Sequence, residues 1–211
     1  MLRLDHLTVI APTLAEGVAH VRASLGLEPP PGGSHPEMGT HNHVMRLGDD
    51  LYLEVVAVDP DAPAPAGPRW FGLGDVAAVR SDWERGRRLR GWVAGTGDID
   101  LVLARHGSLL GVSTRVSRGG RHSRFAVPPD GGLPLDGALP SVIERTGPPP
   151  AARMPDLGAR LRGFVLEHPD PDRVAALYRD LGVDRGPELR AGPEIRYRAL
   201  IDTPGGVRTL T

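Results

Sequence analysis

One strand-and-helix pattern occurs twice in this chain, at residues 4–27 and again at residues 161–183. In each copy a β-rich run ends at a proline, and apolar residues then recur at helical spacing up to a glycine, Gly26 or Gly182. A weaker copy starts near Gly91. A single unit of this kind cannot bury its own sheet face. We therefore expect paired units that bury their sheets together and leave a cleft between them.

Proline-rich stretches at residues 59–68 and 148–155 divide the chain. They predict three parts of one continuous fold, covering residues 1–68, 69–150 and 151–211. The first part is expected to contain a strand over 4–10, a helix from Leu14, a proline- and glycine-rich loop over 29–33, and a hairpin of strands over 42–47 and 51–58. The last part is expected to be a shorter unit, with a strand, a helix and two further strands.

Composition narrows the class of protein. The net charge is −1 and aromatic residues make up 4% of the chain, so we expect no nucleic-acid partner. The chain has no cysteine and no lysine, which excludes thiolate nucleophiles, thiolate metal ligands and Schiff-base lysines. No run approaches the ~18 consecutive apolar residues of a membrane span. We therefore expect a cytoplasmic protein without a membrane partner.

Short motifs follow one another along the chain: Leu4-Asp5-His6-Leu7, Gly32-Gly33-Ser34-His35-Pro36, Gly39-Thr40-His41-Asn42, Leu53-Glu54-Val55-Val56, Gly97-Asp98-Ile99-Asp100, Ala126-Val127-Pro128-Pro129-Asp130-Gly131 and His168-Pro169-Asp170-Pro171. Together they resemble the vicinal-oxygen-chelate superfamily, and more closely its glyoxalase-like-domain branch. The resemblance implies an α+β fold of paired βαβββ modules with curved mixed sheets, to which the chain adds a shortened third unit. It also implies a small-molecule site in the concave cleft between the modules.

The resemblance further implies one divalent metal, held by histidine and glutamate side chains from several strands. It places His6 and Glu54 at two ligand positions and Glu144 at a third. The remaining histidine position falls on Gly91, which has no side chain. The cofactor is therefore either none or a single divalent metal, namely Fe, Mn, Ni or Zn. Glu54 and Glu144 are also the candidate general bases.

His6 and Glu54 each lie among apolar residues in a predicted strand. Burying an imidazole or a carboxylate costs free energy unless the group is paired or binds a metal. Two interpretations follow: both residues bind one metal ion, or they form a hydrogen bond with each other across neighbouring strands. Either interpretation requires the two side chains to lie on the same face of the sheet.

Two candidate binding residues, Asn42 and His43, lie on opposite faces of the strand over 42–47. His43 is placed to replace the missing metal ligand, and the alternative is a histidine that faces solvent or is satisfied locally. His35 precedes Pro36, and because proline restricts the preceding backbone we interpret His35 as part of the loop architecture.

Arg118 and Trp92 complete the candidate binding residues. Arg118 belongs to an arginine-rich segment, and a guanidinium there can bind a carboxylate or phosphate bidentately. A solvated surface position is the alternative for this arginine. Trp92 lies in the strand that opens the second part of the chain.

Two functions remain open at this point. The first is a small-molecule-binding protein without a metal, with an unknown ligand in the cleft. The second is a metal-dependent lyase, isomerase or dioxygenase, in which a metal held by His6, Glu54 and Glu144 polarises two adjacent oxygens of the substrate. The glycine at position 91 favours the first. The expected partner is a small molecule, and homodimer formation is left open.

Overall fold

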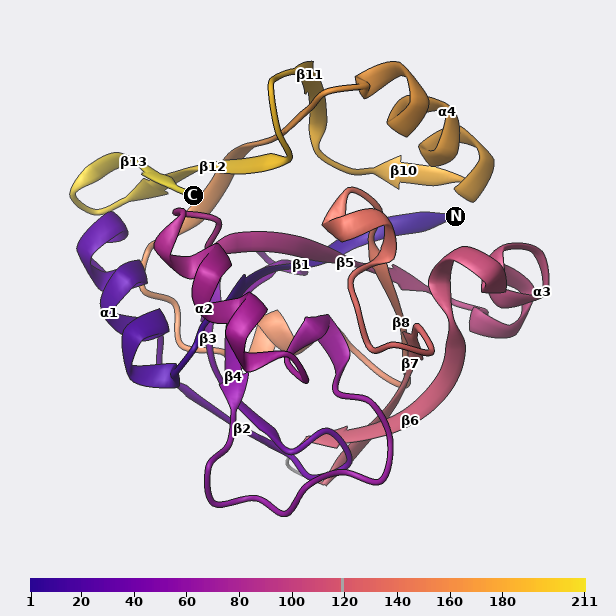
Figure 1. Ribbon diagram of the computed structural model, residues 1–211. Coiled ribbons are helices and arrows are strands. Elements are labelled where there is room, and N and C mark those ends of the chain that lie inside the picture. The colour runs from indigo at the N-terminus through magenta and orange to yellow at the C-terminus, as the bar shows by residue number, and fades with distance from the viewer. Residues whose placement is uncertain (119) are drawn as a thin grey trace.

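Two βαβββ units build the main sheet of the molecule (Figure 1). The computed structural model describes residues 1–118 and 120–211. The first unit comprises β1 (Leu2–Ile10), α1 (Leu14–Leu25), β2 (Pro31–His35), β3 (Thr40–Arg46) and β4 (Tyr52–Val58). The second comprises β5 (Leu89–Thr96), α3 (Ile99–Leu110), β6 (Val112–Arg118), β7 (Arg121–Val127) and β8 (Ser141–Arg145). The α+β class and the paired βαβββ modules expected from the sequence are confirmed.

The helix of the first unit begins and ends where the sequence predicts. At its start, the hydroxyl of Thr13 accepts a hydrogen bond from the backbone N–H of Glu16. At its end, Gly26 has a φ of 71°, and Gly182 ends α4 (Pro171–Leu181) with a φ of 68°. Glycine adopts this left-handed conformation without the steric cost of a Cβ atom. The two glycines of the sequence repeat therefore terminate equivalent helices.

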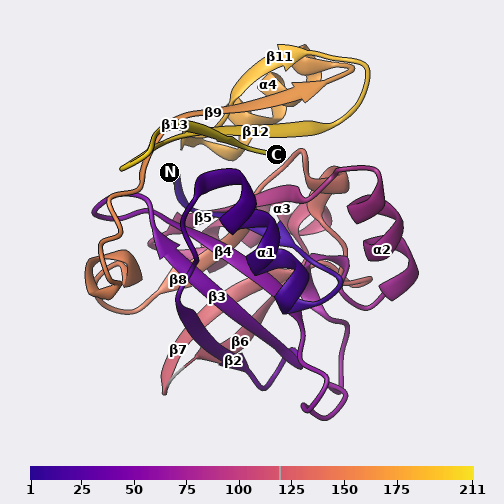
Figure 2. The same ribbon diagram turned by 90° about the vertical axis from the view of Figure 1, so that its left-hand side faces the viewer.

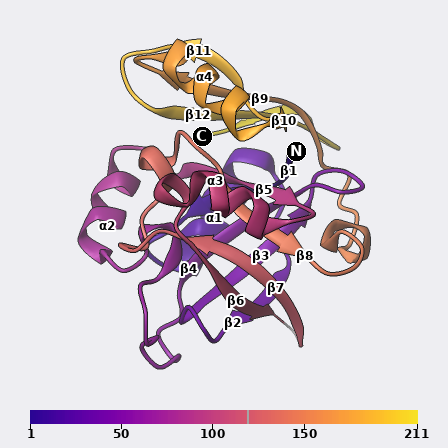
Figure 3. The same cartoon turned by 90° about the vertical axis from the view of Figure 1, so that its right-hand side faces the viewer.

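The strands of the main sheet follow the order β2-β3-β4-β1-β5-β8-β7-β6. β1 and β5 form an antiparallel pair at its centre, and each is parallel to the last strand of its own unit, β4 or β8. The sheet curls until its edges meet (Figures 1 and 3). There the backbone N–H and the hydroxyl of Ser117, on β6, donate to the carboxylate of Glu37, just after β2, over 3.0 and 2.6 Å. The sheet is therefore nearly closed into a barrel.

β2 occupies part of the segment that was expected to be a loop. The proline and glycine content of residues 29–33 led to that expectation, but the strand begins at Pro31 and lies at the edge of the sheet. An edge strand tolerates proline at its first position, because the missing N–H removes no bond from the interior of the sheet.

The barrel separates two apolar cores, because alternate residues of each strand face inward and outward. The inner core contains an aromatic cluster formed by Trp70 and Phe71, from the 3-10 helix η1 (Trp70–Gly72), and by Phe125 of β7. The outer core is larger and includes residues of α1, α3 and the C-terminal part of the chain. A further helix, α2 (Val76–Glu84), connects η1 to β5.

The C-terminal unit lies against the outside of the barrel (Figures 2 and 3). It comprises β9 (Arg160–His168), α4, β10 (Val183–Arg185), β11 (Glu188–Ala191), β12 (Arg196–Thr203) and β13 (Gly206–Leu210). Its own sheet has the order β11-β9-β12-β13, whereas β10 pairs with β1. The unit therefore repeats the opening strand and helix of the first unit but not its strand order. Among the described residues, no helix is long and apolar enough to cross a membrane.

Candidate functional site

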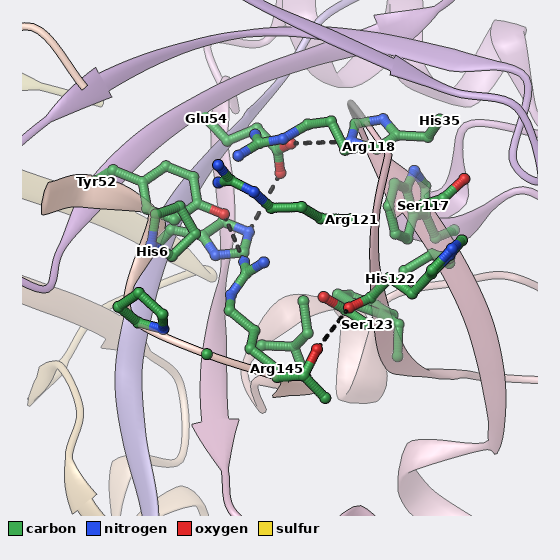
Figure 4. A pocket seen from close by; sticks show the side chains of 18 of the residues that line it. His6, His35, Tyr52, Glu54, Ser117, Arg118, Arg121, His122, Ser123 and Arg145 are labelled. Atoms are coloured by element: carbon green, nitrogen blue, oxygen red, sulfur yellow. Dashed lines mark hydrogen bonds and ion pairs between the residues drawn. The ribbon is translucent and has the colours of Figure 1, made fainter. Parts of the chain in front are cut away.

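The inside of the barrel contains a cavity of about 330 Å³. The aromatic cluster forms part of its apolar side. The polar side carries His6, Tyr52 and Glu54, together with arginines from β6, β7, β8 and the 3-10 helix η3 (Pro150–Arg153) (Figure 4). Cavities of this size, largely apolar with a few convergent polar groups, are typical of small-molecule sites. This cavity is the candidate site.

His6 and Glu54 lie side by side on the polar side. β1 and β4 are parallel neighbours in which Thr8 pairs with Glu54, and His6 shares the face of Thr8. The Nε2 atom of His6 is 3.2 Å from Oε2 of Glu54, and its Nδ1 atom is 2.6 Å from Oδ1 of Asp5. The imidazole also stacks on the ring of Tyr52, with 4.5 Å between centroids. The shared face and the hydrogen-bonding distance expected from the sequence are both present.

The two carboxylates favour the protonated form of His6. Burial alone lowers the pKa of a histidine, but hydrogen bonds to Asp5 and Glu54 outweigh burial and raise the pKa of His6 above its ordinary value. Burial likewise favours a higher pKa for Glu54, but the hydrogen bond from His6 and its charge bring that pKa down to about 2. His6 therefore lies between two carboxylates that favour its imidazolium form, in which both ring nitrogens are donors.

A chain of polar contacts continues from Glu54 to the aromatic cluster. The side-chain amide of Asn42 donates to Oε1 of Glu54 and lies 3.4 Å from Nε2 of His35. The Nδ1 atom of His35 is 3.1 Å from the hydroxyl of Thr40, which accepts from the indole N–H of Trp70 over 3.2 Å. Burial lowers the pKa of His35 to about 4, so this imidazole is neutral at pH 7. Asn42 thus contacts Glu54 from behind instead of lining the cavity.

Arginine side chains give the polar side its positive charge. Arg145 is anchored, since its Nε and Nη2 atoms donate to the carboxylate of Asp5 over 3.0 and 2.8 Å. Its Nη2 atom also donates to the hydroxyl of Tyr52 over 2.7 Å. Three more arginines line the cavity and form no ion pair with a carboxylate of the described residues: Arg118, Arg121 and Arg153. Glu54 is the one acidic side chain among the described residues of the lining.

Besides Asn42, three candidate residues lie outside the cavity. Glu144 precedes Arg145 on β8 and points outward, where it accepts a hydrogen bond from the backbone N–H of Ile99 over 2.7 Å. Trp92 also points outward, into the outer core. His43 faces away from the cavity and contacts a backbone carbonyl oxygen. The structure does not bring these three together with His6 and Glu54, because neighbouring residues of a strand face opposite sides of the sheet.

Sequence reasoning missed Tyr52, Arg145 and the position of His35 beside Glu54. Tyr52 precedes Glu54 by two positions on the same strand and therefore shares its face. The alternation of inward and outward residues along this strand could have identified it. Arg145 directly follows the carboxylate that was selected on β8. The position of His35 depends on the register of β2 against β3, in which His35 pairs with Thr40. No local sequence signal specifies that register.

The donor set of the cavity does not fit the divalent metal implied by the superfamily. Within residues 1–118 and 120–211, no group of three or more His, Cys, Asp or Glu side chains is arranged to hold a metal ion. Both ring nitrogens of His6 already contact carboxylates, those of Asp5 and Glu54. The carboxylate of Asp5 also forms an ion pair with the guanidinium of Arg145. Gly91 contributes no side chain at the position of the missing histidine. A cation in this cavity would face the guanidinium groups of four arginines.

Comparisons with known proteins agree with the fold. The model of the glyoxalase-like domain family matches residues 4–182. No curated protein matches this chain. A solved structure of a hypothetical protein from Staphylococcus aureus is similar, with 12% identity and a TM-score of 0.65 over 96% of this chain and 92% of that one. At this identity the likeness concerns the fold alone.

Weaker likenesses are to methylmalonyl-CoA epimerases. The enzyme from Mycobacterium tuberculosis has 14% identity and a TM-score of 0.43, over 68% of this chain and 88% of that one. A variant from Streptomyces coelicolor in complex with 2-nitronate-propionyl-CoA has 19% identity and a TM-score of 0.44, over 70% of this chain and 96% of that one. Because the family model spans most of the sequence, the chain belongs to the glyoxalase-like domain family.

Proposed function

We propose that this protein binds a small organic anion in the barrel cavity. The observation that carries the proposal is the charge of the lining, in which the guanidinium groups of four arginines accompany one carboxylate. Clefts with one sign of charge and low-dielectric walls concentrate ligands of the opposite sign. The aromatic cluster on the apolar side favours a ligand that also carries an apolar body.

The state of the polar residues supports binding over proton transfer. A general base works best when its pKa lies near the working pH, and the pKa of Glu54 is about 2 because His6 donates a hydrogen bond to it despite its burial. His6 has no free ring nitrogen, since both contact carboxylates. Glu54 and His6 therefore contribute a fixed electrostatic environment to the bound ligand.

The alternative function, a metal-dependent lyase, isomerase or dioxygenase, finds less support. It requires a metal held by His6, Glu54 and Glu144, and Glu144 binds the start of α3 on the other side of the sheet. The arginines around His6 also make the cavity unfavourable for a divalent cation.

A matched set of aromatic probes tests the proposal. Benzoate, benzamide and benzylamine share one ring and differ in charge, and calorimetry measures the Kd of each. We expect benzoate to bind more tightly than the other two, and its affinity to fall as salt is added. Equal binding of benzoate and benzamide would contradict the proposal.

A variant pair localises the binding to the cavity. Arg118→Gln should raise the Kd for benzoate about tenfold, because the ligand loses one charge-assisted hydrogen bond. Arg115→Gln is the control, because Arg115 lies on the same strand but faces an outer surface with Glu144 and Arg124. If both variants lose the same affinity, the anion binds elsewhere.

A further inference from the structure

We propose that the ligand's anionic group is a phosphoryl or phosphonyl dianion carried by an apolar body, and this inference rests on the proposed function. It concerns which anion the arginines select. A carboxylate has one negative charge and two coplanar oxygens, whereas a phosphoryl monoester carries about −1.5 to −2 at pH 7 and presents three acceptor oxygens.

The balance of charge in the cavity favours the dianion. Two cation–anion pairs are already formed, Arg145 with Asp5 and His6 with Glu54. Three further lining arginines have no carboxylate partner among the described residues: Arg118, Arg121 and Arg153. A carboxylate would compensate one of these charges, and a phosphoryl group would compensate nearly two.

The directions from which the arginines approach also favour three oxygens over two. Arg118 and Arg121 pair across the β6–β7 hairpin, and Figure 4 shows both side chains reaching toward the Glu54 side of the cavity. The guanidinium carbons of Arg118 and Arg145 lie 6.0 and 5.8 Å from the centroid of the Tyr52 ring. Donors from β6 and β8 thus lie near one ring, and Arg121 of β7 lines the same cavity. A tetrahedral oxyanion can accept from all of these donors, whereas one bidentate arginine satisfies a carboxylate.

The hydroxyl of Tyr52 adds a neutral donor to this group. It accepts a hydrogen bond from Arg145, and its own proton has no acceptor among the described residues. Burial raises the pKa of Tyr52 above its ordinary value, so the hydroxyl keeps its proton at pH 7. Tyr52 can therefore donate to an oxygen that Arg145 also contacts.

The apolar side of the cavity defines the rest of the ligand. The ring centroids of Trp70 and Phe125 are 4.8 Å apart, and those of Phe71 and Phe125 are 5.5 Å apart. These rings are at most 4% exposed, whereas Arg121 and Arg153 are exposed. The apolar body would therefore contact the buried rings, and the phosphoryl group would lie toward the exposed end.

Calorimetry with phenyl phosphate, benzoate and inorganic phosphate, at one ionic strength, tests this selection. We expect phenyl phosphate to bind at least about tenfold more tightly than benzoate, because it engages at least one more charge-assisted hydrogen bond. Inorganic phosphate should bind more weakly than phenyl phosphate, since it has no group for the aromatic cluster. The preference for phenyl phosphate over benzoate should fall in Arg121→Gln and persist in Arg115→Gln.

The possible failures separate the two proposals. If benzoate binds in the cavity as tightly as phenyl phosphate, the dianion inference is wrong and the proposed function stands. If inorganic phosphate binds as tightly as phenyl phosphate, the apolar body has no role and the inference is also wrong. If neither aromatic anion binds at millimolar concentration, the proposed function itself is contradicted.

Discussion

His6 and His35 are two buried histidines whose pKa values shift in opposite directions, although both lie beside Glu54. His6 donates to two carboxylates, so its charged form is favoured in spite of burial. His35 lies 3.9 Å from the carboxylate of Glu54 and contacts neutral groups instead, so burial decides and its neutral form is favoured. The charge of the hydrogen-bond partners therefore decides which form of each histidine is favoured.

The pH dependence of stability should report the neutral state of His35. The unfolded state binds a proton at about pH 6.5, whereas the folded state resists protonation until about pH 4. Between these values the unfolded state binds more protons, so His35 should make the free energy of unfolding rise with pH, by about 3 kcal/mol. Above pH 6.5 the raised pKa of His6 acts in the opposite direction, and its contribution is lost as the pH rises.

Urea unfolding from pH 4 to pH 8 measures this profile. His35→Gln should flatten the rise between pH 4 and 6.5. His41→Gln is the matched control, because it removes a half-buried histidine on β3. His41 lies on the face of β3 opposite to Thr40, the residue that His35 contacts. A wild-type slope in His35→Gln would show that another group causes the rise.

At the scale of elements, the β6–β7 hairpin forms one wall of the cavity and is held to the other edge of the sheet by a side-chain contact. β2 and β6 are the two edge strands of the sheet and are not paired with each other in its strand order. The carboxylate of Glu37 bridges them by accepting two hydrogen bonds from Ser117. The closure that positions Arg118 therefore depends on one exposed acidic residue.

Glu37→Ala should loosen this closure without unfolding the protein. The amide of Ser117 would lose its acceptor, and we expect its hydrogen exchange to accelerate about tenfold, corresponding to one net hydrogen bond. Hydrogen exchange with mass spectrometry measures the rate in the peptide that contains Ser117. Ser117→Ala keeps the backbone bond to Glu37 and should change this rate less. Unchanged exchange in Glu37→Ala would mean that other contacts hold the hairpin.

At the scale of the whole molecule, two similar halves enclose the cavity and a third unit covers their outer surface. Equivalent strands of the halves carry different chemistry, since Glu54 lies on β4 and Arg145 on the corresponding strand β8. A carboxylate on both strands would suit a cation, but this arrangement supplies one carboxylate and one guanidinium. The approximate symmetry of the backbone is therefore not a symmetry of charge.

Added metal should leave the stability of the protein unchanged. A ligand that binds only the folded state raises the melting temperature, and the cavity offers a cation no complete donor set among the described residues. We expect no shift with an excess of Mn, Fe, Ni or Zn at neutral pH, measured by thermal unfolding of protein treated with chelator. A shift that disappears in His6→Ala, with that variant still folded, would contradict this conclusion.

Local patterns in the sequence were sufficient to predict the repeated strand and helix and the helix ends at Gly26 and Gly182. These features depend on spacing within one segment, and the alternation of a strand or the period of a helix repeats at fixed intervals. The common face of His6 and Glu54 was predicted from their positions in the family motifs and from the cost of burying both side chains. The family motifs then indicated how two such segments pair. This is why the fold could be predicted more completely than the site.

The tertiary structure alone decided the charge of the cavity. Arg145 and Asp5 pair although 140 positions separate them in the chain, and the arginines of the hairpin reach the same space from a third segment. On β8, a shift of one residue exchanges a carboxylate for a guanidinium at the cavity wall, because neighbouring residues face opposite sides. The sequence contains both Glu144 and Arg145, and only the register of β8 in the sheet determines which of them faces the ligand.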